Sequence, residues 1–552
     1  MPTTHSRFAA WLRPVLVLLT LALLADHGVG AGATAVAAPK PRFSVSLDRS
    51  HAITQPGGQV TLTVTVQREA GFNEGVQIFV EGLPAGATAA ALRVESGSNT
   101  GTLMLQAAAD APHSLPTGAA VRGKGGGVTS AALPLTFTLR GAAGDVDTSF
   151  GGARLLAPGG LTDDYVRGVA VQADGKLVVA GFGVFSTATG TDFMLVRYLR
   201  DGGLDSRFGK GGKVSTAFGN AGRSDEAQAV AVQPDGKILV AGSSDQGATG
   251  YDFALARYLP DGMLDTGFGR DGRVTTSFGN GTDKAYALLL LPDGRIVVGG
   301  DSHQGANGSD FALARYNPDG SLDASFGNGG KVLTAIGSDS SRETIYALAQ
   351  QTVAGVARVV AVGGEGDFIA AAYRADGTLD GGFGKAGIVR GLFGSVTGAA
   401  RGVVVTEDNE LILAGHRDHD FAVVRLLPDG RLDTGFGTAG RVVAAISASN
   451  WDEATALVRQ FDGRLLLGGW VYTGNSSSAD TVLLRLNADG SRDEGFGPGG
   501  VRITPVAAGN RTDAGRALAL QPDERVPAMR VLQAGEASGS GDLDILLMRH
   551  WL

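Results

Sequence analysis

The sequence predicts an all-β chain with two folded regions, a β-sandwich followed by a seven-bladed β-propeller. From residue 42 onward, apolar and polar residues alternate in short runs, which is typical of strands. From residue 144 to the end, a pattern of four such runs recurs seven times, at intervals of 53 to 60 residues. Gly makes up 86 of the 552 residues without the three-residue period of collagen, which indicates many turns.

Residues 1–37 have the features of a secretory signal peptide. Arg7 and Arg13 flank the start of an apolar run at 15–25, and AVA at 35–37 is a small-residue cleavage site. The run is shorter than the roughly 20 residues of a membrane-spanning helix, and no second long apolar run follows it. We therefore expect an exported chain that is extracellular, periplasmic or on the cell surface, with no membrane span after cleavage.

Composition excludes several classes of function. The formal charge is −8, so an overall basic surface for nucleic acid is not expected. The chain has no Cys, which excludes disulfides and thiolate metal sites. We expect a monomer.

Residues 38–140 contain about seven short alternating runs separated by Gly and Pro, which predicts a β-sandwich. The segments QPGGQVTLTVTV (55–66), GFNEGVQIFVEGLPAGATAA (71–90) and GTLMLQAA (101–108) resemble bacterial immunoglobulin-like domains. This resemblance implies a spacer or an adhesive module.

Residues 141–552 hold the repeats. In the second repeat the four runs are AQAVAVQ (227–233), KILVAGS (237–243), FALARYL (253–259) and GRVTTSFG (272–279), and PDG between the first two indicates a tight turn. Four short strands per repeat and seven repeats predict a propeller, with strands A to D running outward from the axis. The Phe residues that precede Gly in each repeat read as core between blades: Phe150, Phe208, Phe268, Phe326, Phe383, Phe436 and Phe496.

The repeated units AVAVQPDGKILVAG (229–242), DFALARY (252–258) and LDTGFG (264–269) resemble the delta-60 repeat of bacterial β-propeller proteins. The resemblance covers residues 144–552. It implies a propeller fold and no particular activity.

The phase of the repeats predicts how the ring closes. The chain ends at Leu552, directly after the last C strand, so the last blade lacks a D strand of its own. A D-like run without a blade, GGARLLAP (151–158), precedes the first A strand. We expect this run to pair with residues 543–550, which removes the exposed sheet edges of an open ring.

Two charged positions recur in the repeats and suggest an Asp–Arg clasp within each blade. The Asp of LDxxFG occurs seven times, and an Arg ends strand C in six repeats, with Ala372 in the fourth. A site that is used once does not need seven copies, so we expect a structural ion pair. The predicted pairs are Arg197 with Asp205, Arg257 with Asp265, Arg315 with Asp323, and Asp147 with Arg549, which lies 402 residues away.

An acid also recurs eight residues before each A–B turn, except in the fifth repeat, where Gly398 replaces it. These acids are Asp164, Asp225, Asp283, Glu343, Asp452 and Asp513. One interpretation is capping of the turn before strand A. The other is a carboxylate ring at the mouth of the channel that binds a hard cation such as Ca²⁺.

The B–C and D–A loops vary between repeats, whereas the A–B and C–D turns are uniform, so we expect recognition on the face with the variable loops. Three aromatic residues of the sixth repeat could stack on a sugar there or could pack in the interior: Trp451, Trp470 and Tyr472. A metal site at His416 and His419 is not supported, because no third ligand stands at a known spacing. No catalytic or cofactor-binding residue is predicted.

The favoured function is a secreted or cell-surface binding or scaffold protein, whose partner is an extracellular protein or a glycan. The alternatives are an extracellular enzyme that acts on polysaccharide at the same face, and a purely structural surface protein. An asymmetric cluster of acids, His or aromatic residues on that face would favour the enzyme, and a nearly symmetric face would favour the scaffold.

Overall fold

The computed structural model describes residues 43–552, with short gaps at 115, 152–153, 158–159, 186–189, 220–221, 306–307, 338–341, 365, 395–396, 448–450, 474–477, 507–511, 523–528 and 539–541. The predicted signal peptide lies outside this part of the chain. The described residues form strands and one short 3₁₀ turn, η2 (Pro498–Gly500), and no α-helix.

The first ten strands form two sheets that pack across one apolar core. One sheet has the order β1-β3-β7-β5, and the other has the order β2-β10-β8-β4-β6 with β9 paired to β8. Along β3, Leu62, Val64 and Val66 are buried, and polar residues alternate with them, as the sequence pattern predicts. The strands are β1 (Phe43–Leu47), β2 (His51–Thr54), β3 (Gln59–Arg68), β4 (Val76–Glu81), β5 (Ala87–Ala89), β6 (Leu92–Val94), β7 (Thr100–Ala107), β8 (Thr117–Gly125), β9 (Val128–Thr129) and β10 (Leu133–Leu139).

The repeats form seven antiparallel sheets of four strands, which we number 1 to 7 in chain order of their first strands. Sheets 1 to 3 are β12 (Tyr165–Val171), β13 (Leu177–Gly183), β14 (Asp192–Tyr198), β15 (Lys213–Thr216); β16 (Asp225–Val232), β17 (Ile238–Asp245), β18 (Tyr251–Tyr258), β19 (Arg273–Thr276); and β20 (Asp283–Leu290), β21 (Ile296–His303), β22 (Ser309–Tyr316), β23 (Lys331–Thr334). Sheets 4 to 6 are β24 (Ile345–Val353), β25 (Val356–Gly363), β26 (Ile369–Tyr373), β27 (Ile388–Val389); β28 (Gly398–Val405), β29 (Leu411–Arg417), β30 (Asp420–Leu426), β31 (Arg441–Ala444); and β32 (Asp452–Arg459), β33 (Leu465–Tyr472), β34 (Ala479–Leu486), β35 (Val501–Thr504). Sheet 7 is β36 (Asp513–Pro522), β37 (Met529–Ser538), β38 (Leu543–Trp551) and β11 (Arg154–Ala157).

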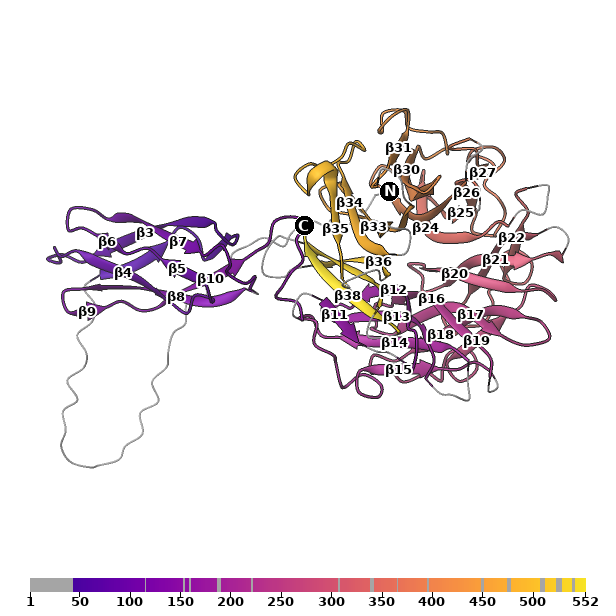
Figure 1. The fold of residues 1–552 in the computed structure, drawn as a ribbon, viewed down its shortest axis with the longest axis horizontal. Coiled ribbons are helices and arrows are strands. Elements are labelled where there is room, and N and C mark those ends of the chain that lie inside the picture. The colour runs from indigo at the N-terminus through magenta and orange to yellow at the C-terminus, as the bar shows by residue number, and fades with distance from the viewer. Residues whose placement is uncertain are drawn as a thin grey trace, which may run out of the picture.

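The sheets are arranged as a closed ring (Figure 1). The first strand of each sheet contacts the first strand of the next, and β36 of the last sheet contacts β12 of the first. Apolar side chains fill the space between neighbouring sheets: one cluster joins Leu239 and Leu255 of sheet 2 to Val298 and Ala312 of sheet 3. The first strands therefore surround the axis, and this β-propeller-like arrangement buries the apolar faces that the repeats share.

The predicted ring closure is confirmed. Strand β11 pairs antiparallel with β38 and places Arg154 opposite Met548 and Ala157 opposite Ile545. A further bridge joins Val146 to His550. Sheet 7 is thus completed by residues from the beginning of the ring, and its outer edge is covered.

The end of β38 also contacts the N-terminal sheets. The indole Nε1 of Trp551 donates to Nδ1 of His113 at 3.2 Å, and the two rings meet edge to face. The guanidinium carbon of Arg530, in sheet 7, lies 4.2 Å from the centre of the Trp551 indole. Trp551 therefore joins the closing strand to the N-terminal region, which lies to the left of the ring in Figure 1.

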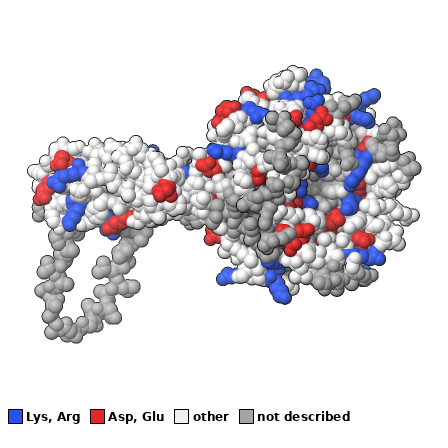
Figure 2. All heavy atoms as spheres, viewed as in Figure 1, with Lys and Arg blue, Asp and Glu red and all other residues white. Residues whose placement is uncertain are grey.

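Charged side chains of both signs are interspersed on the visible face of the ring (Figure 2). Within the described residues, no helix has the length and apolar character needed to cross a bilayer.

Deletion of residues 144–160 tests the ring closure. We expect the backbone amides of β37 and β38 to exchange hydrogen much faster, because β38 loses its outer partner and Arg549 loses Asp147. The measurement is hydrogen exchange followed by mass spectrometry, with sheet 4 on another part of the ring as the internal control. Faster exchange that begins in sheet 4 would contradict the closure.

Candidate functional site

The predicted Asp–Arg clasp is present in the structure. In six sheets the Arg at the end of the third strand donates its Nε–H to the Asp that precedes Phe-Gly. The Nε to Oδ2 distances are 2.9 Å for Arg197–Asp205, 2.8 Å for Arg257–Asp265, 2.8 Å for Arg315–Asp323, 2.6 Å for Arg425–Asp433, 2.9 Å for Arg485–Asp493 and 2.8 Å for Arg549–Asp147. The side chains of Arg549 and Asp147 are fully buried, so the pair that joins residues 402 apart has no contact with solvent.

Each clasp has a further charged member that the sequence analysis missed, the residue that enters the second strand. This residue is a cation near the clasp Asp in five sheets: Lys176, Lys237, Arg295, Arg464 and Arg530, at 3.1 to 3.5 Å. In sheet 4 the same position holds Arg358, which binds Asp380 at 2.6 Å and replaces the missing Arg at Ala372. In sheet 5 it holds Glu410, which lies 3.5 Å from Arg425. The sequence did contain a signal for this member, the Lys or Arg that recurs directly after the turn between the first and second strands.

The clasp also connects each sheet to the next. The guanidinium lies over the ring of the Phe of its own repeat in all seven sheets, with 4.4 to 5.0 Å between the guanidinium carbon and the ring centre. In sheet 2, Arg257 donates to the carbonyl of Pro318 in sheet 3, and in sheet 7, Arg549 donates to the carbonyl of Arg200 in sheet 1. The Gly after each Phe takes part: Gly209, with φ of 51°, donates its N–H to the carbonyl of Asp261 in the next sheet.

Hydrogen bonds lower the pKa of several clasp carboxylates, such as Asp323 and Asp380. Burial alone would raise the pKa of Asp323, but bonds from Ser325 and Arg295 and the charge of Arg315 bring it well below its ordinary value. In sheet 4 the hydrogen bond from Arg358 is the main reason that the pKa of Asp380 is lowered. The clasp side chains therefore bind one another and have a structural role. We call the face of the ring that carries the clasps and the first-to-second and third-to-fourth strand turns the turn face.

The acids that precede the first strands are buried and do not form an exposed ring. Each is at most 5% exposed, and in five of them a carboxylate oxygen accepts a backbone N–H from the end of the preceding fourth strand. These donors are Phe218 to Asp225, Phe278 to Asp283, Ile336 to Glu343, Ile446 to Asp452 and Val506 to Asp513, at 2.7 to 2.9 Å. These hydrogen bonds agree with the capping interpretation. Among the described residues, no group of three or more His, Asp or Glu is placed to hold a metal ion.

These capping acids face the Asp that opens the third strand of the preceding sheet. Burial, and then the charge of Asp192, raises the pKa of Asp225, and burial followed by the charge of Asp283 raises that of Asp252. Burial also raises the pKa of Asp452, with a smaller contribution from Asp420. Pairs of buried carboxylates therefore occupy several sheet junctions, where a proton is easier to bind than in water.

The opposite face, the loop face, carries the second-to-third strand loops and the connections that lead into the first strands. Near this face every first strand contains a β-bulge, three residues after its opening acid position. The seven bulge residues are all partly exposed, and they differ in chemistry: Arg167, Gln228, Tyr286, Tyr346, Arg401, Thr455 and Arg516. We call these seven residues the bulge ring.

Sequence reasoning missed the bulge ring, although a signal was present in the repeated Gly of the second strand. A side chain on Gly181 would place its Cβ 1.9 Å from the carbonyl oxygen of Tyr165, and Gly242 and Gly300 are equally close to Glu226 and Lys284. A glycine inside a strand is typical of a bulge or of close backbone approach. The repeated Gly makes room for the bulge in each sheet.

Ion pairs and rings hold the side chains of the bulge ring. Arg516 and Arg167 both bind Glu536, at 2.9 and 3.2 Å. On another part of the ring, Arg401 lies over Tyr346, with the guanidinium carbon 3.8 Å from the ring centre.

Arg401 also binds Glu453 at 3.2 Å, and His416 lies 3.5 Å from the same carboxylate. The loop face therefore combines cations, acids, His and Tyr in an asymmetric arrangement.

An aromatic cluster lies on the loop face where sheets 5 and 6 meet. Trp451 is 47% exposed, and its ring lies 3.9 Å from that of His419 and 6.4 Å from that of Trp470. Trp470 in turn meets Tyr472 edge to face at 5.3 Å. The two Trp and the Tyr that were singled out from the sequence thus lie together, and His419 joins them.

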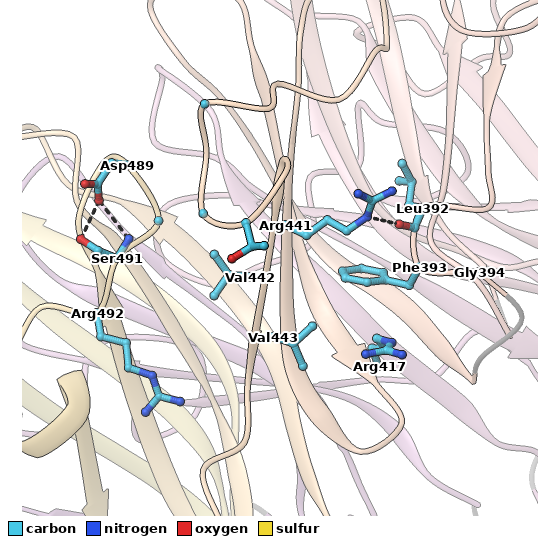
Figure 3. Close-up of a pocket in the computed structure, with 14 residues that line it drawn as sticks. Leu392, Phe393, Gly394, Arg417, Arg441, Val442, Val443, Asp489, Ser491 and Arg492 are labelled. Carbon is cyan, nitrogen blue, oxygen red and sulfur yellow. Dashed lines mark hydrogen bonds between the residues drawn. The ribbon is translucent and has the colours of Figure 1, made fainter.

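A groove of about 1000 Å³ opens at the outer rim between sheets 5 and 6. Figure 3 shows Arg441, Arg417 and Arg492 around it, with Phe393 beside Arg417. Arg441 donates to the carbonyl of Leu392, as Arg273 of sheet 2 does to Ala217. The same kind of bond recurs at another junction, so Arg441 connects adjacent sheets, and the groove is not our first candidate site.

The pKa shifts predict that stability depends on pH in two opposite ways. The junction carboxylates have a raised pKa in the folded state, so they stabilise the fold at low pH and lose this contribution as pH rises. Five clasp carboxylates have a lowered pKa, so their contribution is present at neutral pH and is lost below the ordinary pKa of Asp: Asp205, Asp265, Asp323, Asp380 and Asp433. We expect the unfolding temperature to be a few degrees higher at about pH 5 than at about pH 7.5, and to fall again below about pH 3.5.

Thermal unfolding followed by circular dichroism measures this dependence. Asp225→Asn keeps the oxygen that accepts the Phe218 N–H, removes one junction charge, and should reduce the gain at about pH 5. Asp110→Asn, an exposed position in the N-terminal sheets, is the matched control. A profile that rises steadily from about pH 5 to about pH 7.5 would contradict the assignment.

Comparison with known proteins agrees with the repeat architecture. The model of a family described as "Domain of unknown function (DUF5122) beta-propeller" matches residues 172–208, 233–268, 291–326, 406–436 and 460–496. Each matched segment contains the clasp Asp of its repeat and ends at the Phe of the Phe-Gly pair. No curated protein matches the chain.

Three solved structures show distant likeness. They are a tail fiber of Staphylococcus aureus phage P68 (11% identity, 59% of this chain and 50% of that one, TM-score 0.27), a DUF4784 family protein from Bacteroides caccae (10%, 83% and 98%, 0.22) and domains 4–9 of the surface layer protein SbsC (10%, 85% and 83%, 0.14). This chain spans about half the length of the phage tail fiber, and TM-scores this low establish no shared fold. The five family matches, which recur along the chain in step with its four-stranded sheets, support a β-propeller family.

Proposed function

We propose that this chain is an exported binding protein, in which a seven-bladed propeller of delta-60-type repeats recognises its partner with the loop face. The seven four-stranded sheets serve as the blades, and the two N-terminal sheets serve as an immunoglobulin-like spacer or adhesive module. The leader-like residues 1–37 support export. The partner is an extracellular protein or a glycan.

One observation carries this proposal, the contrast between the two faces of the ring. The turn face repeats the same Asp, Arg and Phe in nearly every sheet, and those groups bind one another. The bulge ring on the loop face holds a fixed backbone shape and presents four types of side chain (Arg, Tyr, Gln and Thr) at its seven equivalent positions. A rigid scaffold with varied side chains on one face is typical of recognition surfaces.

The asymmetry of the loop face also favours a second candidate function, hydrolysis of polysaccharide. His416 lies 3.5 Å from Glu453, and burial lowers the pKa of His416 although the charge of Glu453 opposes this shift. A neutral His beside a carboxylate is a plausible proton acceptor. Release of reducing ends from a bound glycan, abolished by His416→Ala, would support hydrolysis over binding alone.

The absence of Cys permits a direct test of the binding face. Ala248→Cys, in the exposed loop before β18, and Met263→Cys, in the turn after it, lie at opposite ends of the same strand. Each variant is labelled with a maleimide polyethylene glycol and applied to an array of bacterial and plant glycans and to bacterial envelope fractions. We expect the label at residue 248 to reduce binding at least about tenfold by steric exclusion, and the label at residue 263 to have little effect.

The unlabelled variants are the controls, together with wild type that has been treated with the same reagent and has no Cys to label. If the label at residue 263 blocks binding and the label at residue 248 does not, the turn face is the recognition surface and the proposal is wrong.

A further inference from the structure

In the sequences of the seven repeats, Trp451 at the junction of sheets 5 and 6 has no aromatic counterpart at the equivalent position of the other repeats. The residue before each opening acid position is polar in the other six sheets: Asp163, Ser224, Thr282, Arg342, Thr397 and Thr512. Trp451 stands at this position in sheet 6. Its neighbour Trp470 pairs with Glu453 in the same register in which Ser243 pairs with Glu226 and Asp301 with Lys284. At the position of Trp470, sheet 1 also carries an aromatic residue, Phe182, which stacks on Tyr165. The position of Trp451 is therefore the one that sets the junction of sheets 5 and 6 apart.

The backbone fixes Trp451 in place. Its carbonyl accepts the N–H of Tyr472 at 3.1 Å, and the next residue, Asp452, donates its N–H to the carbonyl of His419 at 2.7 Å. The carboxylate of Asp452 accepts two further N–H groups, from Ile446 and Ser447, at 2.7 and 3.0 Å. The backbone at Trp451 is therefore held by both sheets, which reduces the conformational entropy that this residue loses when a ligand binds.

A strained hairpin brings His419 to the indole. Strands β29 and β30 are joined by only two residues, Asp418 and His419, because Arg417 pairs directly with Asp420. Both turn residues have positive φ, 48° and 72°, where Asn and Gly are usual. Such strain, about 1 kcal/mol or more per residue, is typical of functional positions. The ring of His419 is tilted by 55° against the indole, so the two rings form a corner.

We propose that Trp451 is a stacking platform for a pyranose unit of a glycan, with His419 and Asp418 as hydrogen-bonding groups at its edge. The inference rests on the proposed function, since it names the ligand class of the same loop face. The electron-rich face of an indole attracts the C–H groups on one side of a pyranose ring. Exposed His and Asp side chains beside it can bind the sugar hydroxyls.

The composition of the cluster argues for a sugar over a protein partner. Its members are Trp, His and Tyr, with Asp and Glu beside them. A stable protein interface needs a much larger apolar core than one half-exposed indole. A single preorganised aromatic plane with polar groups at its edge is enough to bind one sugar unit.

Affinity electrophoresis of the intact chain tests this inference. The probes are laminarin, xylan, galactomannan and glycol chitin, each cast separately into a native gel. We expect at least one of them to retard the wild type, and Trp451→Ala to weaken the retarding interaction at least about tenfold. Trp451→Phe should retain part of the affinity, because it keeps an aromatic plane.

Phe461→Ala is the matched control, because Phe461 is an 85% exposed aromatic residue in the same sheet, in the turn on the opposite face. It should bind as the wild type does. Wild-type affinity in Trp451→Ala would overturn the platform, and so would the absence of retardation by any of the four probes. Neither result would overturn the loop face as the recognition surface, which the labelled Cys variants decide separately.

Discussion

The fold depends on a buried charge that must be neutralised in every repeat. A carboxylate and a guanidinium removed from water cost several kcal/mol each unless they find each other and satisfy their remaining hydrogen-bonding groups. In this ring they do so by using the neighbouring sheet: the Arg binds its own Asp, lies over its own Phe and donates to a carbonyl of the next sheet. The same contact therefore stabilises one sheet and sets its position relative to the next. The last clasp, between Arg549 and Asp147, joins the two ends of the repeat region and so closes the ring.

This constraint separates the two faces of the ring. On the turn face, hardly any side chain of the clasp can change without leaving a buried charge unpaired, and the repeats stay nearly identical there. Sheets 4 and 5 show how much change is tolerated: Arg358 supplies the guanidinium from the second strand, and Glu410 adds a carboxylate beside Arg425. On the loop face, the bulge in each first strand fixes only the backbone, so Arg167, Tyr286 and Thr455 occupy equivalent places. Side chains can therefore differ between sheets on the loop face, where no charge is buried with a single partner. We expect recognition on that face.

Repetition within one chain made much of this architecture predictable. Because equivalent positions can be compared without any relative, the clasp pairs, the closing strand and the contact between Asp147 and Arg549 follow from the repeats, and the structure confirms them. Lys176 and Lys237 were missed because they belong to the turn motif and reach the clasp only after the second strand folds back beside the third. The bulge ring was missed because a β-bulge changes which way a side chain points without changing the pattern of apolar residues. The sequence also could not predict whether the opening acids are exposed. Whether Asp283 faces solvent or a backbone N–H depends on how the strands pack in three dimensions.

A double-mutant cycle on Asp147 and Arg549 tests the central claim that buried clasps close and stabilise the ring. Asp147→Ala, Arg549→Ala and the double variant are compared with the same cycle on Asp433 and Arg425, whose side chains are each 18% exposed. Each free energy of unfolding is measured by denaturant titration. Our account predicts a coupling energy of about 3 kcal/mol or more for the buried pair, and about 1 kcal/mol for the partly exposed one. A coupling energy near zero between Asp147 and Arg549 would contradict it.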